Sequence, residues 1–442
     1  MKDAKFPRIA LIVMGRVNEA DTFNNGLLLR NLFSDWPKEN LAQIYTNGDD
    51  SLPGFFSKYY QLNAKDRFLG YLFYRYKSTV IEQDTLLSSG LVKNAMSKEV
   101  FNYIFEMFKS IIIDTGLYEI IFKIRLSKGL RGWLNDFKPD FIFVQGYSLG
   151  TVELSLLVAK YLSCPIIYYP TDDWVISFYN PLRSKFKLIS SLAHGLVSKK
   201  TNELVQKATI CLAFNNYMKI EYCRRYGKEF TVFMHGDIAN RFYNIIPKQE
   251  INGAKPLIVT SGQFDSYRFL LLNDADLACE ELVKRGYNPI ILVYVVNLNS
   301  IPKLLMRKFK YIHLAPCPSH NGLVPLLLGA DILFLPERFG DEIWDIKSSV
   351  SSKAHLYMYS KRPIVVYSDS ATGVAKYALE ENWGKVIDRR DPLLLADIFE
   401  KLIIDVNERQ RLSRACEAAV IKNHHLPSIQ ADFKKLLLDT AY

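Results

Sequence analysis

The chain has 442 residues, which exceeds the roughly 250–300 residues at which a single hydrophobic core stops growing, so we expect two domains. Apolar residues make up 49% and charged residues 23% of the sequence, a balance that excludes a disordered or fibrous protein. The net charge of +10 calls for an anionic partner, but the absence of a zinc finger, an RNP motif or an arginine-rich arm argues against nucleic acid.

Membrane, secretion and metal signals are weak. Long apolar stretches such as residues 323–336 contain a charge, Asp331, and fall short of the ~18 residues needed to cross a bilayer. The first residues lead into an apolar run without a small-residue cleavage pattern, which favours a strand over a signal peptide. The six cysteines show neither CxxC spacing nor histidines at zinc-ligand intervals. We therefore predict a cytoplasmic protein with reduced cysteines and no metal site.

The first half of the chain alternates strand and helix patterns. Residues 8–14 form a continuous apolar run closed by Gly15, which is typical of a buried parallel strand. A helical pattern follows Gly26 and stops at Trp36-Pro37. Further strands are expected at residues 41–46, 140–145, 165–169, 209–214 and 230–234, and a further helix at residues 151–161. This alternation indicates a doubly wound parallel sheet.

A stretch of different composition, residues 55–133, interrupts that pattern. It is rich in aromatic and basic side chains, and we predict an inserted helical region there. Two explanations stay open: these residues contact the anionic inner surface of a membrane, or the aromatics pack inside a helical hairpin with the lysines outside.

The second half of the chain repeats the architecture of the first. Residues 239–255 lose periodicity, so we place the interdomain linker there. Strands are expected at residues 256–260, 289–295, 311–314, 332–336, 363–367 and 384–387, and helices at about 274–285 and throughout 392–438. We predict an α/β fold with two Rossmann-like doubly wound parallel-sheet domains: residues 1–245, residues 256–420, and a C-terminal helix at 421–442 that packs back on the first domain.

Short motifs at the strand ends of the second half carry a family resemblance. They are residues 261–263 (SGQ), 329–331 (GAD) leading into LFLPE, 351–353 (SSK) and 361–364 (KRPI). Their order and spacing resemble the nucleotide-sugar glycosyltransferases of GT-B architecture, especially family 4, which includes many bacterial polysaccharide-building enzymes. The resemblance covers nearly the whole chain. It implies that the two domains face a cleft, with the acceptor bound mainly by the first and the nucleotide-sugar donor by the second.

The donor diphosphate of that family is held at the end of the first strand of the second domain. A glycine ends that strand, an arginine follows it, and a lysine comes five positions later. Gly262 matches the glycine, Gln263 stands at the arginine position and Arg268 at the lysine position. The resemblance implies that Arg268 neutralises a phosphate and stabilises the leaving group. A solvent-facing arginine at a helix start is the alternative.

Two further strand ends resemble phosphate-binding segments. Ser351, Ser352 and Lys353 precede an expected helix and resemble a Ser-Lys stretch of related enzymes, where hydroxyls, backbone N–H groups and a lysine form an anion site. Thr372 and Gly373 repeat the strand, loop and helix pattern and are secondary donor candidates. Ordinary helix caps are the alternative in both places.

One family feature is missing. Many members carry two glutamates eight positions apart, one of them contacting the sugar or ribose, and the corresponding positions here are Ser348 and Leu356. Glu337, or Asp341 with Glu342, is a candidate substitute, because ligands of open α/β sheets bind at the carboxyl edge.

The first domain offers candidates on the acceptor side. Gly26 resembles a loop glycine that lets acceptor or donor phosphate approach the backbone. Asp172 and Asp173 follow an expected strand in a turn similar to the family's His-Asp-x-Trp segment, with Thr171 at the histidine position. Either acid is a candidate base or positioning group for an acceptor hydroxyl. A helix cap formed by the two acids is the alternative.

The resemblance implies a hexosyltransferase-like enzyme of cell-surface polysaccharide biosynthesis. It would move a sugar from a nucleoside diphosphate sugar to a saccharide or lipid-linked saccharide, with retention at the anomeric carbon, peripheral contact with the membrane and no cofactor. A nucleotide-sugar epimerase and a non-catalytic protein that binds sugar nucleotides or glycans remain alternatives. The sequence contains neither GxGxxG nor GxxxxGK[ST], which argues against a nicotinamide dehydrogenase and a P-loop enzyme.

Overall fold

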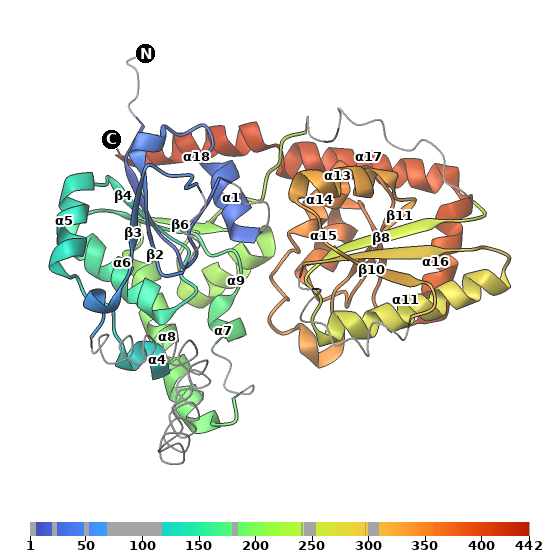
Figure 1. Ribbon diagram of the computed structural model, residues 1–442, viewed down its shortest axis with the longest axis horizontal. Coiled ribbons are helices and arrows are strands. Elements are labelled where there is room, and N and C mark those ends of the chain that lie inside the picture. Colours follow the sequence, from blue (N-terminus) through green and yellow to red (C-terminus); the bar gives the residue numbers. More distant parts are fainter. Residues whose placement is uncertain are drawn as a thin grey trace, which may run out of the picture.

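A computed structural model of the chain describes residues 6–19, 24–47, 53–68, 117–178, 184–239, 242, 253–296, 298 and 309–441. The chain forms two α/β domains side by side, one from the first half and one from the second (Figure 1). Within the described residues, no helix combines the length and apolarity that crossing a bilayer requires.

The first domain is built on a seven-stranded sheet in the order β3-β2-β1-β4-β5-β6-β7, and its described strand pairs are parallel. The strands are β1 (Ile9–Ile12), β2 (Leu41–Tyr45), β3 (Lys58–Gln61), β4 (Phe141–Val144), β5 (Ile166–Tyr168), β6 (Ile210–Ala213) and β7 (Thr231–Val232). β1 lies between β2 and β4, and all its residues are buried, as its continuous apolar run predicted.

Helices surround this sheet. They are α1 (Asn24–Leu32), α4 (Leu117–Ile121), α5 (Lys128–Phe137), α6 (Leu149–Leu162), α7 (Trp174–Phe178), α8 (Lys187–Lys207) and α9 (Asn216–Tyr226), with short 3₁₀ turns η1 (Lys38–Asn40) and η2 (Ala64–Asp66). Side chains fix several helix starts: Ser148 accepts from the backbone N–H of Thr151 and so caps α6 at a strand end.

The second domain repeats this arrangement with six strands in the order β10-β9-β8-β11-β12-β13. The strands are β8 (Leu257–Gly262), β9 (Ile290–Val295), β10 (Ile312–Pro316), β11 (Ile332–Pro336), β12 (Ile364–Tyr367) and β13 (Lys385–Ile387). The helices are α11 (Ser266–Lys284), α13 (His320–Gly329), α14 (Lys353–Tyr359), α15 (Gly373–Glu381), α16 (Pro392–Ile404) and α17 (Val406–Asn423), with the 3₁₀ turn η4 (Gly340–Ile343). Separate apolar clusters pack on the two faces of this sheet, which confirms the predicted doubly wound fold.

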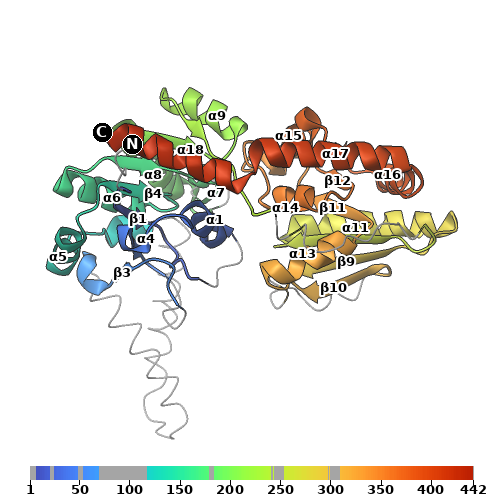
Figure 2. The ribbon, with the colours of Figure 1, turned by 90° about the horizontal axis from the view of Figure 1, so that it is seen from above.

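The last helix, α18 (Leu426–Ala441), returns to the first domain (Figure 2). Phe433 is fully buried in the core of that domain, and its ring lies 5.5 Å from the ring of Phe33 and 6.1 Å from that of Trp36. Gln430 adds a hydrogen bond from its amide to the Asn31 carbonyl at 2.6 Å. The C-terminal segment therefore connects the two domains a second time.

The structure departs from the sequence prediction in two places. Lys58–Gln61, inside the predicted helical insertion, form β3 at the edge of the first sheet, where half-buried tyrosines are favoured. Residues 69–116 of that insertion lie outside the described residues, as does most of the predicted linker. The long helix α8 was not predicted, because small and polar residues such as Ser190 and Thr201 occupy its buried face. The exact domain boundaries stay a prediction.

Candidate functional site

A cavity of about 780 Å³ lies between the two domains. Each wall is formed at the point where the strand order of a sheet reverses. In the first domain this wall is the chain that follows β1 and β4, and in the second domain it is the chain that follows β8 and β11. Open parallel sheets bind ligands at such points, beyond the carboxyl ends of the strands. Of the predicted site residues, the cavity is lined by Gly26, Asp172, Gly262, Gln263, Arg268, Glu337, Ser351, Ser352 and Lys353.

A buried charge cluster occupies the second-domain wall. Arg268, in the first turn of α11, forms an ion pair with Glu337, which follows β11 and is only 3% exposed. Burial opposes ionisation of Glu337, but Arg268 and Lys353 outweigh it and lower the pKa of the carboxyl group. Arg268 is therefore not a solvent-facing arginine at a helix start, which was the alternative prediction. Its guanidinium binds Glu337 inside the cavity wall.

Lys353 is the unusual member of this cluster. Its ammonium nitrogen is buried and makes no hydrogen bond with any residue that the structure describes. Burial, opposed by Glu337 and assisted by Arg268, lowers the pKa of this side chain to about 8. The lysine is thus held in the cavity wall without a hydrogen-bonding partner for its charge.

Gly262 makes room for that lysine. It ends β8 with φ at 128°, a region that disfavours side chains, and a Cβ atom there would lie 2.9 Å from Lys353 Cδ. Ser352 lies directly before α14 but makes no capping hydrogen bond, whereas the hydroxyl of Ser351 helps to lower the pKa of Glu337. Ser352 is therefore not a side-chain cap of α14, and Ser351 supports the charge cluster through Glu337.

The secondary donor candidates lie behind the cavity wall. Thr372 is fully buried and caps α15, and its hydroxyl donates to the Asp369 carbonyl at 2.8 Å. A Cβ atom on Gly373 would lie 2.5 Å from the carbonyl oxygen of Ser349. Neither is among the described residues that line the cavity: the Thr372 hydroxyl bonds within its own turn and helix start, and Gly373 packs against the loop around Ser349.

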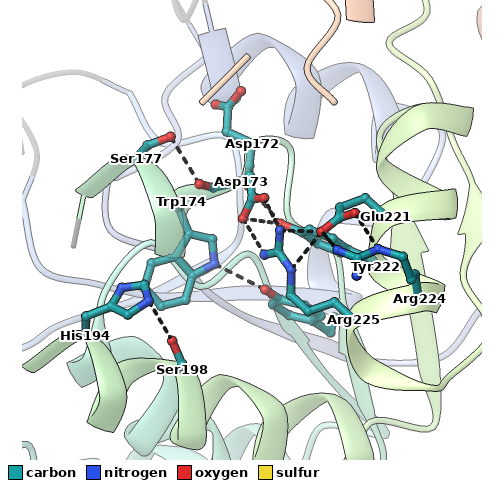
Figure 3. Close-up of polar contacts among 11 residues, drawn as sticks. Asp172, Asp173, Trp174, Ser177, His194, Ser198, Glu221, Tyr222, Arg224 and Arg225 are labelled. Atoms are coloured by element: carbon teal, nitrogen blue, oxygen red, sulfur yellow. Dashed lines mark hydrogen bonds and ion pairs between the residues drawn. The ribbon is translucent and has the colours of Figure 1, made fainter. Parts of the chain in front are cut away.

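The two adjacent acids of the first domain point in different directions (Figure 3). Asp173 is 3% exposed and receives two hydrogen bonds from Arg225, at 2.8 and 2.6 Å. Asp172 instead lines the cavity with an exposed side chain. Enclosure by the two domains, followed by the nearby carboxylates of Asp345 and Asp173, raises its pKa. Of the two acids, only Asp172 therefore lines the cavity, whereas Asp173 holds the turn through Arg225.

A polar group beside Asp172 was not predicted from the sequence. Tyr147, after β4, has φ at 69°, which is rare for a bulky residue and common at functional sites. Its hydroxyl hydrogen-bonds the Thr171 hydroxyl, which donates to the Asn25 side chain at 3.1 Å. These side chains line the cavity next to Gly26. The Gly146-Tyr147 dipeptide at a strand end was the available sequence signal.

Three histidines, His235, His320 and His355, line the cavity, and a fourth, His424, lies next to His355. The rings of His235 and His355 stack with centroids 4.2 Å apart, and His424 lies 5.8 Å from His355. His320 Nε2 lies 2.8 Å from a carboxylate oxygen of the fully buried Asp237. This group was not predicted, because its members are far apart in the chain. Among the described residues, no set of three or more His, Cys, Asp or Glu side chains is arranged to hold a metal ion.

Comparisons with known proteins agree on the fold. No family model and no curated protein sequence matches the chain. Among solved structures, sucrose-phosphate synthase from Thermosynechococcus elongatus is similar with a TM-score of 0.63 at 10% identity, over 98% of each chain. HepE from Anabaena, in complex with UDP and glucose, gives 0.57 at 10% identity, over 98% of this chain and 99% of HepE.

A third similar structure is WaaG, a glycosyltransferase involved in lipopolysaccharide biosynthesis, with a TM-score of 0.56 at 11% identity over 97% of this chain and 99% of WaaG. These similarities extend over both sheets of this chain. The chain therefore has the predicted GT-B fold, with two Rossmann-like domains that face a common cleft.

Proposed function

We propose that this protein is a glycosyltransferase that moves a sugar from a nucleoside diphosphate sugar to a saccharide or lipid-linked saccharide, in the synthesis of cell-surface polysaccharide. One observation carries the proposal: the buried ammonium of Lys353 lies beside Arg268, over the glycine that ends β8, without a hydrogen-bonding partner among the described residues. A diphosphate would give this ammonium the charged hydrogen-bond acceptor that it lacks among the described residues. HepE structures hold UDP and UDP-glucose, so UDP is the first nucleotide to test.

In the proposed reaction, an acceptor hydroxyl oxygen forms a bond to the anomeric carbon while the bond from that carbon to the diphosphate breaks. The electron pair leaves with the diphosphate, where Lys353 and Arg268 stabilise the developing charge. Asp172 lies in the opposite wall of the cavity and accepts a hydrogen bond from the acceptor hydroxyl, which orients it. The acceptor proton passes to the departing diphosphate on the same face, which gives retention. The proposal needs no cofactor.

Thermal unfolding against a panel of nucleoside diphosphates and their sugars tests the donor site. A ligand that binds only the folded state stabilises it by about 2.7 kcal/mol at a hundred times its Kd. We expect one nucleotide to raise the melting temperature of the wild type and to lose this effect in Arg268→Ala and Lys353→Ala. If no nucleotide acts at millimolar concentration, the donor site is refuted.

A non-catalytic sugar-nucleotide-binding protein is the second candidate. Gln263 replaces one family cation, and Ser348 and Leu356 stand where family members carry glutamates. Such a protein would bind the nucleotide sugar but never release its sugar. The release of nucleoside diphosphate from the bound donor distinguishes the enzyme from the binding protein. If the wild type releases nucleoside diphosphate and Asp172→Asn releases it more slowly, the protein is an enzyme.

We also propose that the protein works in the cytoplasm at the inner membrane surface. Besides the net charge, Leu188 and Leu192 on α8 are 77% and 70% exposed, one turn apart and next to the exposed Lys185 and Lys187. Leu188→Ser with Leu192→Ser should reduce sedimentation with vesicles rich in phosphatidylglycerol. Leu393→Ser, at an exposed leucine of α16, is the matched control. Equal sedimentation of all three proteins refutes this contact.

A further inference from the structure

We infer that Asn215 of the first domain is a positioning residue for the second-domain wall of the cavity. It holds the segment before α14, residues 346–352 (the 346–352 loop), in the position in which that loop lines the cavity. The inference rests on the proposed function and adds a residue that acts on the site through another segment. Asn215 lies directly before α9, is 1% exposed and is not among the described residues that line the cavity.

The side chain of Asn215 makes one hydrogen bond in each domain. Its oxygen accepts from the backbone N–H of Met218 at 2.9 Å and so caps α9. Its N–H group donates to the carbonyl of Ser348, in the second domain, at 2.9 Å. Because a backbone N–H only donates and a carbonyl only accepts, the two partners fix which way the amide points. Serine, threonine or aspartate would cap α9 as well, but asparagine also supplies the N–H that reaches Ser348.

Ser348 belongs to the loop that leads into the second-domain wall. The residues from Ser349 to Lys353 line the cavity, and Ser351 and Lys353 both act on the carboxyl group of Glu337. The first domain therefore holds the chain one residue before it enters this wall. Ser348 is only 8% exposed, so a loop that moved away from Asn215 while the domains stay packed would leave buried polar groups without partners.

A second contact of α9 supports the same part of the second domain. The Tyr217 hydroxyl donates to the Glu380 carboxylate of α15 at 2.6 Å. α15 in turn supports the loop, because the N–H of Gly373 at its start donates to the Ile346 carbonyl at 3.2 Å. The start of α9 thus contacts both the loop and the helix that supports it. The position of the loop, and of the lysine that follows it, depends on this contact between the domains.

Hydrogen exchange of the unliganded protein, followed by mass spectrometry, tests the position of the loop. Asn215→Asp keeps the cap of α9 but replaces the donating N–H by a carboxylate oxygen that repels the Ser348 carbonyl. We expect faster exchange in peptides that cover residues 346–353 and unchanged exchange in peptides that cover α9. Asn63→Asp, the same change at the exposed cap of η2, should alter neither. Unchanged exchange at residues 346–353 in Asn215→Asp, with or without faster exchange in α9, overturns the inference.

Calorimetric titration with UDP tests the consequence for the cleft. Asn215→Ser keeps the cap but is too short to reach Ser348, and the loss of one neutral hydrogen bond should weaken UDP binding about three- to tenfold. Asn215→Asp should weaken it further, because it adds repulsion, whereas Asn63→Asp should bind UDP within about twofold of the wild type.

Two results distinguish a failure of this inference from a failure of the proposed function. If Asn215→Asp speeds exchange in the loop but binds UDP as the wild type does, Asn215 does not position the site, and the inference is overturned although the proposed function stands. If the wild type binds neither UDP nor any other nucleoside diphosphate, the proposed function fails and the positioning role fails with it.

Discussion

Replacing Lys353 by methionine should make the protein more stable while it weakens the binding of a nucleoside diphosphate. Methionine fills a similar volume without a charge. In the wild type, the ammonium is buried without a hydrogen-bonding partner in the described part of the chain, and this lowers the pKa from the ordinary 10.5 to about 8. The lowered pKa measures how much the folded protein disfavours the charged form.

The size of the gain follows from that pKa. Each pKa unit corresponds to about 1.4 kcal/mol, so the charged lysine lowers the free energy of unfolding by about 3 kcal/mol at pH 7. The attraction of Glu337 is already included, because the pKa responds to it. Between pH 8 and 10.5 the unfolded chain binds more protons than the folded one, so wild-type stability rises with pH across this window. The advantage of methionine should therefore shrink as the pH rises.

Urea denaturation at pH 7 and at pH 10 checks this, with Lys199→Met, at an exposed lysine of α8, as the control. We expect Lys353→Met to gain about 1 to 3 kcal/mol at pH 7, and much less at pH 10. The loss of a charge-assisted hydrogen bond to phosphate should weaken nucleotide binding by about 10- to 100-fold. A variant less stable than the wild type at pH 7, or one with the same gain at both pH values, would show that the buried charge of Lys353 does not destabilise the fold.

Three further substitutions test the geometry of the cleft and of its supports. Gly262→Ala should lower the free energy of unfolding by about 1 to 3 kcal/mol and weaken nucleotide binding, because φ is 128° at this position and the added Cβ would meet Lys353. Calorimetry measures both effects. The control Gly132→Ala, in α5, should leave the stability unchanged or raise it slightly. Asp173→Ala should lower the free energy of unfolding by about 1 to 3 kcal/mol, because Arg225 loses two hydrogen bonds and keeps only Glu221 as its ion-pair partner among the described residues; normal melting with lost transfer would instead make Asp173 a reactive group. Phe433→Ala should cost about 3 to 5 kcal/mol in urea denaturation, and a cost below 1 kcal/mol would show that α18 contributes little to the first domain.

Most of the fold was predictable because parallel strands that are buried on both faces leave continuous apolar runs in the sequence. β1 and β11 are such runs, and both lie where they were expected. β3 was missed because an edge strand with half-buried tyrosines resembles its aromatic surroundings. In α8, buried serine and threonine hide the helical period.

The residues of the candidate site were predictable only where they belong to short sequence motifs. Gly262, Arg268 and Lys353 follow strand ends in a recognisable order, and Glu337 was found because carboxyl edges bind ligands. The histidines were missed because tertiary contacts alone bring them together: His320 and Asp237 are 83 residues apart. With Thr171 at the histidine position, the resemblance matches Asp172 to the family's acid, but it left both acids as candidates; the ion pair of Asp173 with Arg225 distinguishes their roles.

A crystal structure of the protein with UDP-glucose would show directly whether the cleft binds a donor. We expect the diphosphate within hydrogen-bonding distance of Lys353 Nζ, over Gly262, with the anomeric carbon facing Asp172 across the cleft. A nucleotide sugar bound elsewhere on the molecule, or a cleft that stays empty at saturating ligand, would contradict this expectation.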